Sequence, residues 1–390
     1  MLSDYANRKD TYKLIYFDNS ATSKPCAESV AAAEKAMKDT WGNPSSLHGL
    51  GVAAEGLLNS ARESVAEALC CLPEEITFTS GATESNNTAL FSAALTKGKR
   101  RKKIITTAAE HPSISEPLKR LSEQGFEIVK LSPGKDGVIS KDEVLRQIDK
   151  NTLMVSVMLV NNETGAIFDV PSIFKAVKAA DSEVYTHTDA VQGFMKLNIN
   201  AKKLNADMIS VSGHKVYAPK GVGALYIKKG LNLKPFIVGG GQERAKRSGT
   251  ESTPIISAFG AAVKAHICDM DERYKKVQSL REALKNGISA LDKAYIHEFE
   301  NTLPYVASLT LEGYKSETLL HFLEERGIYV SSGSACSKGK KSEVLKSFLY
   351  DDKALDSTIR ISFCADNTEA EVIALTEALK EAQSTLCKIK

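Results

Sequence analysis

Short apolar runs alternate with amphipathic stretches along the central part of the chain. The runs are rich in β-branched residues, as buried strands are, and the stretches between them repeat apolar positions at the spacing of helices. This alternation predicts strand–helix units and a mainly parallel sheet with helices on both faces. The predicted strands are 75–80, 103–110, 126–132, 152–160, 183–191, 206–213 and 223–229, and the predicted helices are 82–95, 113–125, 140–150 and 170–180.

The pattern changes near residue 255. A long stretch at 258–291 keeps helical periodicity with few helix-breaking residues, so it predicts one long helix. The remaining sequence mixes strand-like and helical patterns, which indicates an α+β arrangement. Its predicted strands are 305–311, 328–332 and 357–363, and its predicted helices are 317–327 and 368–386.

Two domains are expected from this change in pattern. The chain has 390 residues, which is more than one simple core usually holds. We expect a large domain at 21–256. We expect a smaller α+β domain formed by 1–20 together with 257–390.

Composition and charge narrow the class of protein. The chain is 43% hydrophobic and 25% charged, with a net charge of +3, which is typical of a soluble globular protein and gives no support for nucleic-acid binding. The basic run KGKRRKK at 97–103 lies between a predicted helix and a predicted strand, so we interpret it as a solvated loop. No apolar stretch approaches a membrane span, and the first 20 residues lack the pattern of a secretion signal. A cytoplasmic location, with no membrane partner, is the expectation.

The seven cysteines are odd in number and contain no C-x-x-C pair. They therefore predict neither a disulfide framework nor a zinc site, and no metal is expected. Cys336 differs from the others because its neighbours in SSGSACSKGKK, at 331–341, are small residues rather than apolar ones. The three lysines just downstream either lower its pKa or are merely solvated charges, and both interpretations stay open.

Polar residues follow several of the predicted strands. Ligands bind beyond the carboxyl ends of such strands, so these residues are candidates for a site. Thr83 begins a helix just after Gly81, where free N–H groups favour a phosphate, although a capped tight turn would have the same sequence. His111 follows the next strand, and a lone histidine is also common as a structural residue. Further candidates after strands are Asn161, Asn162, Asp189, Gln192, Ser212, His214 and Lys215.

Together these residues match the needs of pyridoxal phosphate. A lysine amine can form a Schiff base with it, and a carboxylate can keep its pyridine nitrogen protonated, so that the ring accepts electrons. A histidine can stack on the ring, and a helix N-terminus can hold the phosphate. A dinucleotide fits less well, because no G-x-G-x-x-G opens a helix here.

The motifs resemble those of a known family and occur in the same order. TSGATESNN, EHPSI, VNNETGAI, HTDAVQ, SGHKVYAPKGVGALY, GGGQERAKRSGTES, SSGSACS and STIRISF are similar to the signatures of the cysteine desulfurases. These enzymes form part of the class V aminotransferase branch of fold type I pyridoxal-phosphate enzymes. DNSATS and GNPSSLHGLG also fit, so the resemblance covers nearly the whole chain. It implies an α/β fold with a large domain and a smaller one that carries a mobile cysteine loop at about 331–345.

The resemblance implies a role for each candidate. Lys215 would form the Schiff base, Asp189 would pair with the pyridine nitrogen, and His111 would stack on the ring and assist proton transfers. Arg360 would bind the substrate carboxylate, a surface salt bridge being the alternative for this residue. The other implied cofactor contacts are Ala82; Thr83, Ser212 and His214 at the phosphate; Asn161, also a substrate contact, and Gln192 at the ring hydroxyl; and Thr250, supplied by a neighbouring subunit.

The activity implied by the resemblance is the conversion of L-cysteine to L-alanine, with transfer of sulfur to Cys336 as a persulfide. A homodimer and a sulfur-acceptor protein, either an iron–sulfur scaffold or a tRNA-thiolation enzyme, are the implied partners. A selenocysteine lyase or another class V aminotransferase or lyase is the alternative, although a transaminase needs no thiol. A non-catalytic protein of this fold would not need to keep Lys215, Asp189 and Cys336.

Few positions depart from the family pattern. Ala218 and Ser252 replace a Gly and an Asn of the usual motifs, and both are small-residue changes. The sequence ends soon after its last predicted helix, at STLCKIK, whereas housekeeping desulfurases use a longer tail to dock the scaffold protein. The identity of the sulfur acceptor therefore stays open.

Overall fold

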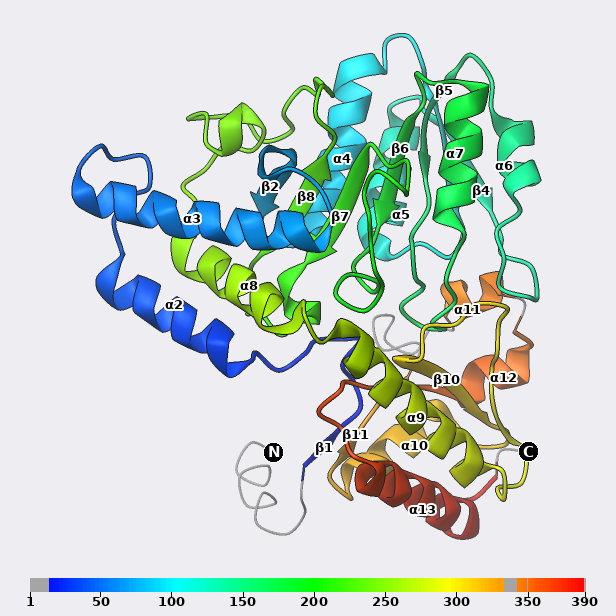
Figure 1. The fold of residues 1–390 in the computed structure, drawn as a ribbon. Coiled ribbons are helices and arrows are strands. Elements are labelled where there is room, and N and C mark those ends of the chain that lie inside the picture. Colours follow the sequence, from blue (N-terminus) through cyan, green and yellow to red (C-terminus); the bar gives the residue numbers. More distant parts are fainter. Residues whose placement is uncertain (1–13, 333–341, 349, 389–390) are drawn as a thin grey trace.

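The computed structural model describes residues 14–332, 342–348 and 350–388, so Cys336 and the lysines after it lie outside the described residues (Figure 1). In the described part of the chain, the largest sheet has seven strands in the order β2-β8-β7-β6-β5-β3-β4. Neighbouring strands from β7 to β4 are parallel, and β8 is antiparallel to both of its neighbours. The strands are β2 (Ile76–Thr79), β3 (Lys103–Thr107), β4 (Glu127–Leu131), β5 (Thr152–Ser156), β6 (Tyr185–Asp189), β7 (Met208–Ser212) and β8 (Gly223–Ile227). The predicted mainly parallel α/β sheet is confirmed.

Both faces of this sheet are buried. Successive side chains of a strand point to opposite faces, and on β3 Ile104 and Ile105 accordingly belong to two different hydrophobic clusters. The cluster that contains Ile104 includes side chains of α4 and α5, and the cluster that contains Ile105 includes side chains of α3, α7 and α8. Strands that helices cover on both faces have nearly continuous apolar sequences, and this pattern made the strands predictable. The helices are α2 (Ala27–Asp39), α3 (Gly49–Ala68), α4 (Ala82–Lys97), α5 (Pro112–Glu123), α6 (Lys141–Gln147), α7 (Val170–Ala180) and α8 (Thr253–His266).

A smaller unit lies beside one end of the large sheet (Figure 1). Its sheet is antiparallel with the order β12-β13-β10-β9, and a short parallel pair, β1-β11, joins the start of the described chain to this unit. The strands are β1 (Ile15–Tyr16), β9 (Ala294–Ile296), β10 (Val306–Leu311), β11 (Ile328–Tyr329), β12 (Ser331–Ser332) and β13 (Thr358–Ser362). The helices are α9 (Met270–Ile288), α10 (Ser316–Glu324), α11 (Glu343–Ser347), α12 (Asp352–Ser357) and α13 (Glu369–Thr385).

The prediction of one long helix at 258–291 is wrong, because α8 ends at His266 and α9 begins at Met270. Asp269 precedes α9 and two more acids stand in its first turn, where carboxylates interact favourably with the helix dipole. This acidic group marks a helix start that periodicity alone does not reveal. The two helices also pack on different partners, α8 on α2 and α3, and α9 on α13. The expected domain boundary, 256–257, lies within α8, and the division into domains stays a proposal.

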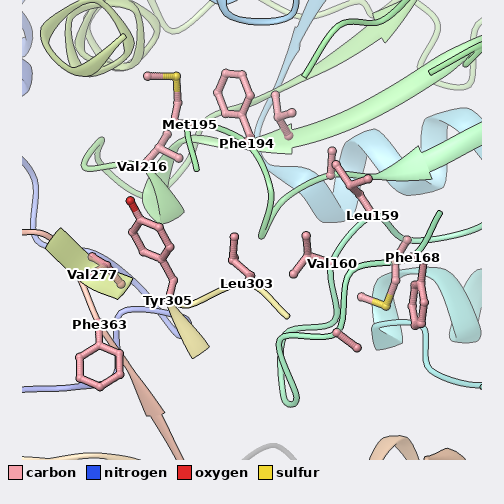
Figure 2. Close-up of a cluster of buried hydrophobic side chains, with 14 of the residues drawn as sticks. Leu159, Val160, Phe168, Phe194, Met195, Val216, Val277, Leu303, Tyr305 and Phe363 are labelled. Atoms are coloured by element: carbon pink, nitrogen blue, oxygen red, sulfur yellow. The ribbon is translucent and has the colours of Figure 1, made fainter. Parts of the chain in front are cut away.

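Apolar side chains join the two units. Leu303 and Tyr305, which precede β10, belong to the same hydrophobic cluster as Phe194 and Met195 of the large unit (Figure 2). This shared core fixes the smaller sheet against the end of the large one. None of the described helices combines the length and apolar character needed to cross a membrane.

Three of the six basic side chains in the run at 97–103 form ion pairs with other described residues. Lys97 pairs with Glu183 at 2.8 Å, Arg101 pairs with Asp181 at 2.6 Å, and Lys103 pairs with Asp149 at 2.5 Å. These pairs hold the connection between α4 and β3 against neighbouring loops. They favour the structural interpretation of the run over a nucleic-acid contact.

Candidate active site

A cavity of about 1450 Å³ opens at the carboxyl ends of the parallel strands. This is the place where α/β sheets bind ligands, because the ends of several strands and the starts of several helices meet there. Of the residues predicted for the site, the cavity is lined by Ala82, Thr83, His111, Asp189, Gln192, Ser212, His214, Lys215 and Arg360.

Asp189 ends β6 with its carboxylate buried against the start of α4. Its Oδ2 accepts a hydrogen bond from Asn86 Nδ2 at 2.7 Å, and its Oδ1 accepts one from the Val191 amide at 3.0 Å. Asn86 also donates to Ser113 Oγ at 2.8 Å, so it ties α4 and α5 to the carboxylate. Sequence reasoning missed Asn86. The signal was present, because Asn86 lies three residues after Thr83, on the same side of α4.

Lys215 lies in a short 3-10 turn, Gly213–Lys215, directly after β7. Its Nζ donates hydrogen bonds to the carbonyl oxygen of Ala21, at 2.7 Å, and to that of Ser20. Gln192 Nε2 donates to the same Ser20 oxygen at 3.0 Å. The segment DNSATS, far away in sequence, therefore forms the cavity wall against which the amine lies.

His111 caps the N-terminus of α5. Its Nδ1 accepts a hydrogen bond from the Ser113 amide at 3.1 Å, which leaves the proton of a neutral ring on Nε2. Burial lowers the pKa of His111, Asp189 raises it, and Lys215 lowers it, with a net decrease. A neutral ring presenting one N–H to the cavity can both stack on a flat ligand and exchange a proton.

The start of α4 lies at one end of the cavity and has groups suited to holding an anion. Gly81 has a φ of +154° and precedes the free N–H groups of Ala82 and Thr83. Ser212 Oγ is buried there and has no hydrogen-bond partner among the described residues. His214 Nδ1 lies 3.3 Å from Thr22 Oγ1, and burial and nearby lysines lower its pKa to about 4.

The polar groups that line the cavity fit pyridoxal phosphate. The unpartnered Ser212 hydroxyl and the helix start suit the phosphate, and the buried Asp189 carboxylate suits a protonated pyridine nitrogen. Lys215 supplies an amine in the same cavity. The cavity therefore has the chemical groups that this cofactor requires.

Arg360 is not a surface residue, so the alternative of a surface salt bridge is excluded. It lies on β13 with 8% of its surface exposed. One guanidinium nitrogen pairs with Asp18 at 2.8 Å, another donates to the Asn162 carbonyl oxygen at 3.1 Å, and Nε has no partner among the described residues. A buried guanidinium facing a cavity is suited to binding a carboxylate.

Asn161 is the residue whose placement differs most from the expectation. It is completely buried and does not line the cavity, since its Nδ2 donates to the Ala109 carbonyl oxygen and its Oδ1 accepts from the amides of Glu163 and Thr164. Its neighbour Asn162 lines the cavity instead, and Asn162 Oδ1 is buried without a partner in the described part of the chain. The role of Asn161 at the cofactor and substrate stays a prediction that this geometry does not support.

Thr250 lies away from the cavity of its own chain. It borders a separate hollow of about 310 Å³ together with Met37 and Trp41. The expectation that Thr250 acts in a neighbouring subunit is compatible with this placement.

Cys336 itself lies outside the described residues, but both flanks of its segment reach the cavity. Ser332, at the end of β12, and Ser342, the N-cap of α11, line it. Ser342 Oγ donates to Glu163 Oε2 at 2.6 Å, and burial raises the pKa of Glu163 to about 7.

Comparison with known proteins identifies the family. The family described as aminotransferase class-V matches residues 15–375. The chain is 37% identical to the cysteine desulfurase of Nostoc sp. over 94% of this chain and 92% of that protein. It is 36% identical to the cysteine desulfurase IscS of Methanosarcina thermophila, over 95% and 92% of the two chains.

Solved structures agree with these relatives. A NifS-like protein with 37% sequence identity has a TM-score of 0.91 and covers 96% of this chain and 100% of its own. A structure described as SspA in complex with cysteine has 32% identity and a TM-score of 0.81, with 91% and 100% coverage. The chain belongs to the class-V aminotransferase family of fold type I. Within that family its relatives are the cysteine desulfurases, whose enzymes depend on pyridoxal phosphate.

Proposed function

We propose that this enzyme is a cysteine desulfurase that takes sulfur from L-cysteine onto Cys336 with the help of bound pyridoxal phosphate. The observation that carries the proposal is a convergence of chemistry in one cavity. The amine of Lys215, the carboxylate of Asp189, the neutral ring of His111 and the buried guanidinium of Arg360 all line it. The flanks of the segment that contains Cys336 line the same cavity.

Bound pyridoxal phosphate would act as an acceptor for the electrons released at the substrate α-carbon. Asp189 would hold the pyridine nitrogen in its protonated form, and Asn86 keeps that carboxylate oriented. Ala82, Thr83, Ser212 and His214 would hold the phosphate. Lys215 would attach the cofactor and, once released as a free amine, would remove the α-proton of the substrate.

Arg360 would orient L-cysteine by pairing with its carboxylate, and this requires part of the guanidinium to exchange its present contacts with Asp18 and Asn162. The thiolate of Cys336 would then form a bond to the substrate sulfur. The carbon–sulfur bond would break with its electron pair left on the carbon skeleton. Two protons would complete L-alanine: the one that Lys215 removed would return to the α-carbon, and one delivered by Lys215 or His111, equal to the proton given up when the Cys336 thiol ionises, would go to the β-carbon. The products are alanine and a persulfide on Cys336, so atoms and electrons balance.

A second copy of the chain would complete the site. Apolar side chains are exposed along α2 and the connection to α3, including Trp41 at 67% and Leu47 at 98%. Two of these exposed side chains, Met37 and Trp41, border the same hollow as Thr250. We propose that this face packs against a second subunit and that Thr250 reaches the phosphate site there. A sulfur-acceptor protein, either an iron–sulfur scaffold or a tRNA-thiolation enzyme, would remove the sulfur from Cys336.

Replacement of Cys336 tests this function directly. The variant Cys336→Ser should bind pyridoxal phosphate, with visible absorbance equal to that of the wild type. Its production of alanine and sulfide from L-cysteine, with a thiol reductant present, should fall by at least about 100-fold, because the nucleophile is missing. The matched control Cys70→Ser removes an exposed thiol and should keep full activity. Undiminished turnover by the Cys336 variant would contradict the proposal.

A further inference from the structure

Gln192 lines the cavity, and both polar atoms of its side-chain amide form hydrogen bonds. The nitrogen donates to a carbonyl oxygen, and the oxygen accepts from a lysine. Gln192 Nε2 donates to the Ser20 carbonyl oxygen at 3.0 Å, and Gln192 Oε1 accepts from Lys196 Nζ at 3.3 Å. The Ser20 carbonyl oxygen can only accept a hydrogen bond, so it fixes the orientation of the amide. Nε2 carries two hydrogens, and the Ser20 oxygen takes one of them. Among the described residues no acceptor for the second is found.

Lys196 is an unusual residue for its location. It is 9% exposed, and in the described part of the chain it forms no ion pair with a carboxylate. Its Nζ lies 5.5 Å from the centroid of the ring of Tyr305, which belongs to the shared core of the two units. Burial, with smaller contributions from Lys215 and Arg360, lowers the pKa of Lys196 to about 7, and Cys364 acts in the opposite direction. An apolar side chain would avoid this desolvation, so stability alone does not account for a lysine here.

The contacts of Gln192 connect this lysine to the catalytic one. Lys196 contacts Gln192, Gln192 contacts the Ser20 carbonyl oxygen, and that oxygen also accepts from Lys215 Nζ. We propose that Lys196 is a positioning residue that holds Gln192 Oε1, so that the second hydrogen of Gln192 Nε2 points to an acceptor oxygen on the ring of the bound cofactor. The inference rests on the proposed function, because it takes that ring to be pyridoxal phosphate.

The test is a double-mutant cycle on cofactor affinity. The dissociation constant for pyridoxal phosphate is measured by visible absorbance, on apoprotein of the wild type, Lys196→Met, Gln192→Leu and the double variant. Lys196→Met should weaken binding by about 3- to 10-fold, the worth of one hydrogen bond. In the Gln192→Leu background, the same change should alter binding by less than about twofold, because the link is already absent.

Two further variants separate positioning from general support of the core. Lys196→Arg keeps a donor for Gln192 Oε1 and should restore affinity to within about twofold of the wild type. Should Lys196→Met not fold, Lys196→Gln takes its place in the same cycle. Thermal unfolding of each apoprotein checks folding, and the Met variant should be at least as stable as the wild type, since it removes a buried charge.

The outcomes are distinct. An equal loss of affinity in both backgrounds, or no loss in either, overturns the positioning role of Lys196. A wild-type protein that does not bind pyridoxal phosphate contradicts the proposed function itself. Wild-type binding with an unaffected Lys196→Met variant contradicts only this inference.

Discussion

The properties of individual side chains in this site depend on their burial as much as on their chemical type. Asp189, Arg360 and Lys196 are charged groups that the fold removes from water, and each is held by specific hydrogen bonds. A sequence reveals such residues when they lie at the end of a strand, as Asp189 does, or just after one, as Lys215 does. It does not reveal residues whose role arises from packing, such as Asn86 on a helix or Lys196 in a series of turns. The sequence also favoured Asn161 over Asn162. Only the fold of this turn determines which of the two side-chain amides faces the cavity.

Glu110 provides a test of burial at the residue scale. Its Oε1 accepts from the Met158 amide at 2.8 Å and from Thr107 Oγ1 at 2.9 Å, while Oε2 is buried without a partner among the described residues. Burial, together with the negative charge of Asp189, raises its pKa from 4.5 to about 8. Between these values the unfolded chain has released the proton and the folded protein still holds it. The stability contributed by this group therefore falls as pH rises through that window.

Glu110→Gln should remove this dependence. Relative to the wild type, the melting temperature of the variant should rise between pH 5 and pH 8.5, by about 2 °C or more. The control Glu123→Gln changes an exposed carboxylate on the neighbouring helix α5 and should give a constant difference over the same range. A constant difference for Glu110→Gln as well would mean that Glu110 is ionised in the folded protein at pH 5.

At the scale of elements, the site depends on how closely α4 approaches the strands beneath it. The order of strands and helices in the large unit could be predicted, because buried parallel strands leave continuous apolar runs. The break between α8 and α9 could not be predicted from periodicity, because both helices keep an apolar face and only their packing partners differ. The pairing of β1 with β11 was equally hidden, since two-residue strands carry no pattern.

Gly223 on β8 sets the approach of α4. A Cβ atom there would lie 2.7 Å from the Val211 carbonyl oxygen and 2.8 Å from the backbone of Gly81, and neither backbone atom can move freely. Gly223→Ala should destabilise the protein by about 1–3 kcal/mol, as overpacking does. It should also weaken binding of pyridoxal phosphate, because it displaces the start of α4.

The matched control for Gly223 is Gly56, in the interior of α3, where a new Cβ would meet no atom within 4 Å. Gly56→Ala should stabilise the protein by about 0.5–1 kcal/mol, because alanine is the better helix former. Denaturant unfolding measures both variants. Equal stability of Gly223→Ala and the wild type would show that β8 and α4 have more space between them than the structure indicates.

At the scale of the whole molecule, the described chain has a nearly complete site and an exposed apolar face in separate places. The cavity contains the groups for the cofactor ring, the amine and the substrate carboxylate, whereas Thr250 borders the hollow beside Trp41. The resemblance in sequence suggested the separation, because it assigned Thr250 to a neighbouring subunit. A single chain could not reveal which surface faces that subunit, because exposed apolar residues along α2 become meaningful only once the fold gathers them near Thr250.

Mixing two impaired variants tests whether sites are shared between subunits. Lys215→Ala should be inactive and Thr250→Ala should bind the cofactor weakly, each as a homodimer. If subunits exchange, half of the dimers contain one chain of each kind, and one site in such a dimer combines an intact Lys215 with an intact Thr250 from the partner chain. The mixture should therefore recover about a quarter of the wild-type activity at a cofactor concentration that leaves the Thr250 variant largely empty. Subunit exchange is verified by mass spectrometry. If exchange occurs and no activity is recovered, Thr250 acts within its own chain or has no role at the site.

A matched mixture of Lys215→Ala with Asp189→Asn should recover nothing, because both of these residues line the cavity of one chain and no hybrid site contains both intact.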